Sequence, residues 1–145
     1  MSVKAAPQTE LAATMSRLTA AADDAARRTL IAQHPSLDWE AIVSALADRV
    51  RQEINVNTAN AQHLADIAIV VAETIGSQIA LARSLRAKAN ALYATDQHVG
   101  AIERHGSAAA LFEALGEKQE LARTLSSSIQ PFLLLGRYDE ALAAW

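Results

Sequence analysis

A pattern that occurs twice, forty residues apart, is the strongest constraint on how this chain folds. Residues 73–85 and 113–125 both read E-x-x-G-x4-L-A-R-[ST]-L. In each copy a glycine follows an apolar stretch, and a short polar segment then leads into the next one. This is the pattern of one helix ending and another beginning. Its repetition at a fixed offset predicts an array of similar helical hairpins.

Composition favours the same fold and excludes several functional classes. Of the 145 residues 33 are alanine, the best helix former, and no β-branched alternating stretch predicts a strand, so we expect an all-α protein with closely packed helices. The net charge is −3 with scattered basic residues, which argues against nucleic-acid binding. No apolar run is long enough to span a membrane. The absence of cysteine excludes thiolate chemistry and fits a cytoplasmic protein.

Apolar periodicity and capping residues place about seven helices. The expected helices cover residues 9–33, 39–54, 58–75, 79–94, 98–115, 118–135 and 137–145, the last one truncated. Pro131 predicts a kink or an early end in the sixth. A tail and capping helix (1–36) would precede helical repeats (37–145), divided approximately into 37–77, 78–117 and an incomplete 118–145. Because the last helix is too short to be stable alone, we expect the chain to be the front part of a longer array.

The repeats resemble the tetratricopeptide repeat. The last unit matches that pattern at Leu125, Phe132, Gly136, Tyr138, Ala141 and Trp145, and departs from it at Ile129. The middle unit matches at Leu85, Ala89, Leu92, Ala101 and Ala108, whereas Asp96, His98 and His105 replace the usual glycine, tyrosine and aromatic residue. The period of about forty resembles the N-terminal repeats of bacterial signalling proteins with a caspase-like CHAT domain. The resemblance implies antiparallel hairpins stacked as a right-handed α-solenoid.

The same resemblance implies a concave groove for a protein or peptide partner. The side chains expected in it are Arg83, Arg86, Asn90, Tyr93, Arg123 and Gln130, joined by Ser44, Asp48 and Arg51 of the preceding unit. A forked guanidinium beside an amide suits a carboxylate, so the partner is expected to be acidic. The alternative interpretation is a merely solvated face. The recurring pairs Glu73 with Arg83 and Glu113 with Arg123 are interpreted as structural ion pairs.

No pattern in the chain indicates catalysis, a cofactor or a metal site. The four histidines, His34, His63, His98 and His105, lack ligand spacing, and residues 126–128 are serines without a nucleophile elbow. Gly106, inside a predicted helix, indicates a bend or a close helix crossing. We therefore expect a non-catalytic scaffold, with any enzymatic activity beyond residue 145. One alternative is an effector-sensing module of a signal-responsive ATPase or transcription regulator. Another, a closed helical-bundle enzyme, would need paired inward carboxylates that the spacing does not provide.

Overall fold

The protein is all-α, as predicted. The computed structural model describes residues 5–134, and the side chains of residues 10–127. Within these residues there are seven helices and no strand. The helices are α1 (Ala5–Ala20), α2 (Asp24–Gln33), α3 (Trp39–Glu53), α4 (Thr58–Ile75), α5 (Gln78–Ala94), α6 (His98–Ala114) and α7 (Lys118–Leu134).

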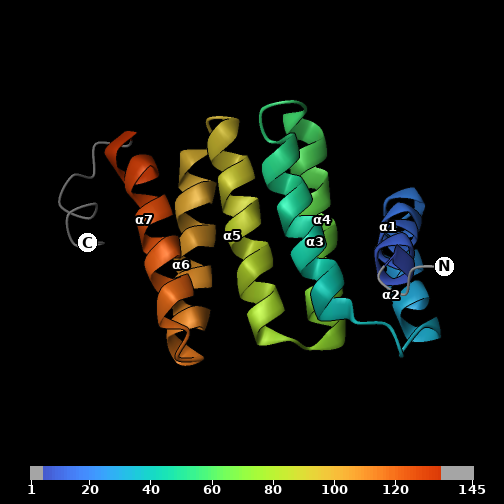
Figure 1. The fold of residues 1–145 in the computed structure, drawn as a ribbon. Helices are drawn as coiled ribbons and strands as arrows, with labels where there is room; N and C mark the ends of the chain where they lie inside the picture. Colours follow the sequence, from blue (N-terminus) through green and yellow to red (C-terminus); the bar gives the residue numbers. More distant parts are fainter. Residues whose placement is uncertain (1–4, 135–145) are drawn as a thin grey trace.

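The helices follow one another across the molecule in chain order (Figure 1). From α3 onward, each helix packs against the next one in the chain. Contacts that skip one helix join α1 to α3, α2 to α4, α3 to α5 and α5 to α7. Packing between near neighbours is what stacked hairpins produce. The right-handed solenoid of tetratricopeptide type stays a prediction.

The N-terminal segment forms two helices, so the single helix predicted over residues 9–33 is wrong. Asp23 begins α2 as its N-cap, where its carboxylate accepts a hydrogen bond of 2.8 Å from the backbone N–H of Ala26. The buried Arg27 donates from Nε to the carbonyl oxygen of Leu18 at 2.9 Å. The end of α1 and the start of α2 both have side-chain partners for their free backbone groups. The break between the helices therefore lowers the stability of the fold only slightly. Helical periodicity continues across it, which is why the pattern predicted one helix.

The repeated sequence pattern corresponds to a repeated junction. Gly76 and Gly116, predicted to end helices, both have left-handed backbone conformations, with φ of 69° and 72°. At the [ST] position of the pattern, Ser84 and Thr124 are fully buried, and each hydroxyl donates at 2.8 Å to the carbonyl oxygen four residues earlier. The small polar residue is thus satisfied within its own helix and leaves no buried donor unpaired.

Substitution of the junction glycine gives a direct test of this backbone geometry. Gly76→Ala is expected to lower the free energy of unfolding by about 1 kcal/mol, because a Cβ disfavours the left-handed conformation. The matched control is Gly106→Ala in α6. A Cβ at Gly106 would meet nothing within 4 Å, so the close crossing predicted there is wrong. Gly106→Ala should instead raise the free energy of unfolding by about 0.5–1 kcal/mol, because alanine favours the helix more than glycine does. Urea denaturation followed by circular dichroism measures both; equal effects at the two sites would contradict this account.

The buried side chains form two clusters, and α5 lies between them. The larger cluster joins α1 to α5 and includes Leu46 and, from α5, Ala80, Ala87 and Ala91. The smaller cluster contains Ala82 of α5 with Ala108 and Phe112 of α6. Alanine on both sides of α5 lets the neighbouring helices approach closely. A third side of α5 carries Arg83, Arg86 and Asn90.

The C-terminal predictions have mixed outcomes. Helix α7 runs to Leu134, so it does not end early at Pro131. The helix predicted over residues 137–145 lies outside the described residues.

Candidate functional site

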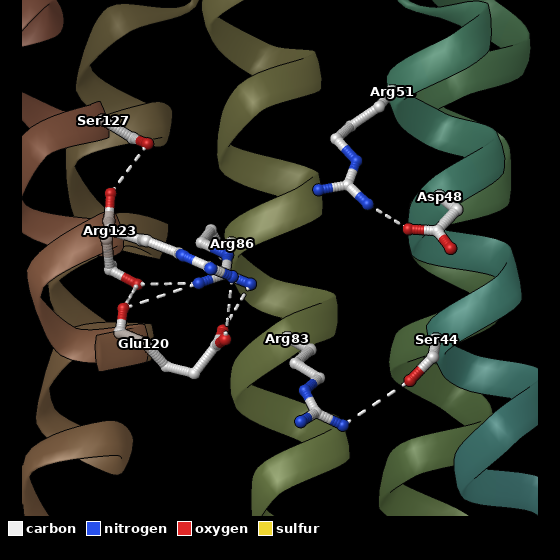
Figure 2. A network of polar contacts seen from close by, with 9 residues as sticks. Ser44, Asp48, Arg51, Arg83, Arg86, Glu120, Arg123 and Ser127 are labelled. Atoms are coloured by element: carbon white, nitrogen blue, oxygen red, sulfur yellow. Dashed lines mark hydrogen bonds and ion pairs between the residues drawn. The ribbon is translucent and has the colours of Figure 1, made fainter. Parts of the chain in front are cut away.

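A hollow of about 180 Å³ opens between α3, α5 and α7. It is lined by Ser44, Ala47, Asp48, Arg51, Arg83, Arg86, Ala87, Asn90, Glu120 and Arg123, and we call it the α3–α5–α7 groove (Figure 2). The structure thus brings together four of the predicted partner-binding residues, namely Arg83, Arg86, Asn90 and Arg123. These come from two helices whose junctions carry the repeated pattern.

The two other predicted site residues are placed differently. Tyr93 lines an adjoining hollow at the end of α5, together with Val56 of the α3–α4 turn, and this hollow shares Asn90 with the groove. The Tyr93 ring packs against His98, with ring centroids 5.3 Å apart. The side chain of Gln130 lies outside the described residues.

The groove carries an excess of positive charge. Four guanidiniums line it, against the two carboxylates of Asp48 and Glu120. Asp48 pairs with Arg51 at the exposed rim of α3. Glu120 lies deeper and contacts both Arg86 and Arg123. Because the chain as a whole has a net charge of −3, this local excess sets the groove apart from the average surface.

Arg86 connects α5 to α7. Its Nη2 lies 2.7 Å from Oε2 of Glu120, and Nη1 is 3.5 Å from both the carbonyl oxygen of Glu120 and the hydroxyl of Thr124. The guanidinium also lies over the ring of Phe112, 5.2 Å from its centroid. Only 17% of the Arg86 side chain is exposed. Arg86 therefore holds two helices together in addition to lining the groove.

Among the side chains of residues 10–127, Arg83 is the guanidinium in the groove that has no carboxylate partner. It points toward α3, where Nη1 is 3.5 Å from the hydroxyl of Ser44 (Figure 2). The predicted ion pair with Glu73 is wrong, because Glu73 is exposed and forms no ion pair among the described residues. The equivalent pair of Glu113 with Arg123 is wrong too, since Arg123 contacts Glu120 of its own helix at 3.3 Å. Arg83 thus remains available to an anionic ligand.

His105 is buried in α6, with 2% of its surface exposed. Burial, and to a lesser extent the positive charge of Arg86, lowers the pKa of His105 from 6.5 to about 4. Neither ring nitrogen has a hydrogen-bond partner. The ring is therefore neutral at pH 7, and its one N–H is buried without an acceptor. The signal in the sequence was the histidine at a position where the repeat usually has an aromatic residue.

Glu120 is the charged groove residue that sequence reasoning missed. In the repeated pattern it occupies the place of Ala80, which is 1% exposed and packs in the larger cluster. A charged residue where the other copy has a buried alanine was the available signal. Its negative charge is compensated by Arg86 and Arg123, which lie on either side of it.

Two further observations bear on function. Within residues 5–134 no helix combines the length and the apolar character needed to cross a bilayer, and the side chains described include no group of three or more potential metal ligands. Comparison of the chain with protein-family models, with curated proteins and with solved structures gives no match. The resemblance to tetratricopeptide repeats therefore stays a prediction from the sequence pattern.

Proposed function

We propose that this chain is a non-catalytic helical-repeat module that binds an acidic segment of a protein partner in the α3–α5–α7 groove. The observation that carries the proposal is the guanidinium of Arg83, which lines a positively charged hollow and pairs with none of the described carboxylates. Arg83, Arg123 and Asn90 offer forked donors and an amide, which suit a carboxylate. The repeat pattern supports a place in a larger bacterial signalling protein of tetratricopeptide type.

The size of the groove favours a side chain over a whole small molecule. Its volume of about 180 Å³ is below the roughly 300–1,000 Å³ that is typical of small-molecule pockets. An acidic side chain or a peptide terminus fits this space, while the rest of the partner lies over the open face. The effector-sensing alternative has no comparable support from the groove.

A substitution that removes the charge of Arg83 but keeps a polar side chain tests the proposal. The probe is a fluorescein-labelled hexaglutamate peptide, with hexaglutamine as the neutral comparison, titrated at low ionic strength and followed by fluorescence anisotropy. Arg83→Gln is expected to raise the Kd for hexaglutamate about tenfold, because it removes a charge-assisted contact from a sheltered site. Its melting temperature should stay within about 2 °C of wild type, since the 3.5 Å contact to Ser44 contributes little.

The matched control is Arg49→Gln. This substitution changes the net charge by the same amount as Arg83→Gln. The half-exposed side chain of Arg49 pairs with Glu53 and does not line the groove. Its substitution should change the Kd by no more than about twofold to threefold, because only the long-range electrostatic attraction is reduced. Equal weakening by both substitutions would mean non-specific attraction. No binding of hexaglutamate to the wild-type chain would refute the proposed function.

A further inference from the structure

Glu120 places a carboxylate inside a groove whose proposed ligand also carries one. Its Oε2 contacts Arg86 of α5 at 2.7 Å, and its Oε1 contacts Arg123 of α7 at 3.3 Å. One carboxylate thus bridges two guanidiniums from two helices (Figure 2). Only 16% of the Glu120 side chain is exposed. The best-sheltered cationic position in the groove is therefore already occupied from within the chain.

The contact between Glu120 and Arg86 is short but poorly directed. Oε2 is enclosed, yet no N–H of Arg86 is aligned on it well enough to form a hydrogen bond. Hydrogen bonds weaken steeply when the donor is misdirected, so this contact is mainly a Coulomb attraction. A carboxylate that is free to choose its orientation could bind the same guanidinium in the stronger two-pronged geometry.

The repeated pattern indicates that packing does not require an acid at this place. The equivalent residue of the other copy is Ala80, which fills its position in the larger cluster with a methyl group. The hydroxyls of Ser84 and Thr124 make the same intrahelical bond in both copies, so the helix geometry is unchanged by the substitution. Glu120 is thus an addition to the junction and not one of its structural requirements.

We propose that Glu120 is an internal competitor of the ligand: its carboxylate occupies the position between Arg86 and Arg123 that the ligand's carboxylate takes on binding. This inference rests on the proposed function of the groove. The ligand class that it names is an acidic side chain or a peptide C-terminus that bridges the two guanidiniums after displacing Glu120. Glu120 therefore sets a threshold, because weakly acidic segments cannot compete with a carboxylate that is always present.

The test is Glu120→Gln, a nearly isosteric change, with the hexaglutamate peptide as probe. Its Kd is expected to fall about tenfold, because Arg86 becomes available and a negative charge leaves the site. Its melting temperature is expected to fall at the same time, because the ion pair between α5 and α7 is lost. Adding Arg86→Gln to this variant should return the Kd to about the wild-type value. If Glu120 merely positions Arg86 for the ligand, Glu120→Gln would weaken binding, and the inference would be overturned.

Glu103→Gln is the matched control for charge. Glu103 is 65% exposed on α6, outside the groove, and its substitution changes the net charge equally. It should change the Kd less than about twofold to threefold. If Glu103→Gln increased the affinity for hexaglutamate as much as Glu120→Gln does, the inference would also be overturned.

A measurement on the wild-type chain covers the case in which Glu120→Gln is too unstable to assay. In a ¹⁵N-labelled sample, the side-chain Nε–Hε signal of Arg86 should shift as hexaglutamate is added, because its guanidinium exchanges one carboxylate for another. An unchanged Arg86 signal at saturation, with hexaglutamate binding still weakened in Arg83→Gln, would refute the internal competitor and leave the proposed function intact. Absence of any binding to the wild-type chain would instead refute the proposed function itself.

Discussion

Phe112→Ala is expected to lower the free energy of unfolding by about 3–5 kcal/mol, the largest effect of any single substitution considered. Phe112 is fully buried and is the largest of the completely enclosed side chains within residues 10–127. It belongs to the smaller cluster with Ala82 and Ala108, where the alanines provide little apolar volume to replace it. The loss also removes the ring beneath Arg86. Urea denaturation followed by circular dichroism measures the change.

The matched control is Leu46→Ala in the larger cluster, where Leu46 is also fully buried. Leu46→Ala should lower the free energy of unfolding by about 2–5 kcal/mol. Hydrogen exchange separates the two variants. Because the clusters are distinct, Phe112→Ala should remove protection mainly from α6 and α7, and Leu46→Ala mainly from α3 and α4. Equal loss of protection along the whole chain in both variants would indicate one shared core and would contradict a nearest-neighbour array.

Acid is expected to destabilise the protein through His105. The folded-state pKa is about 4 and the ordinary value is 6.5. Between these values the unfolded chain binds a proton that the folded chain does not, so stability falls as the pH falls. The loss of stability due to His105 becomes negligible as the pH rises well above 6.5, and at pH 4 it amounts to about 3 kcal/mol. Urea denaturation at several pH values between 7 and 4 measures this dependence.

The control is His105→Leu, which has a similar volume and no titratable group. Acid protonates carboxylates in both proteins alike, so the difference between their pH profiles isolates the histidine. The leucine variant should lose about 3 kcal/mol less stability between pH 7 and pH 4. It also removes two ring nitrogens that have no hydrogen-bond partners. Identical pH profiles for the two proteins would exclude His105 as the origin of the acid sensitivity.

Most of the fold could be predicted from the sequence because helix ends have local chemical signals. Asp38, Asn57 and Ser77 accept hydrogen bonds from backbone amides at the starts of α3, α4 and α5. Gly76 and Gly116 have the left-handed conformation that glycine permits at helix ends. The resemblance to tetratricopeptide repeats also predicted that Arg83, Arg86 and Asn90 share one groove, and all three line it.

The errors concern features that depend on contacts distant in the sequence. The guanidinium of Arg27 stabilises the break between α1 and α2 by bonding to a carbonyl nine residues earlier, which no periodic pattern reveals. Pairing of Arg86 with Glu120 depends on how closely α7 approaches α5. The sequence predicted arginine partners from equivalent repeat positions, Glu73 and Glu113, but ion pairs follow distance in space. Burial of His105 is likewise set by three-dimensional packing.

On helix α5, the residues that pack against neighbouring helices lie on different sides from those that line the groove. This separation has an evolutionary consequence. Ala80, Ala87 and Ala91 belong to one cluster and Ala82 to the other, while Arg83 faces the groove. Changes at Arg83 or Asn90 leave the alanine contacts with neighbouring helices in place. Partner preference could therefore diversify at these positions while the scaffold is inherited unchanged.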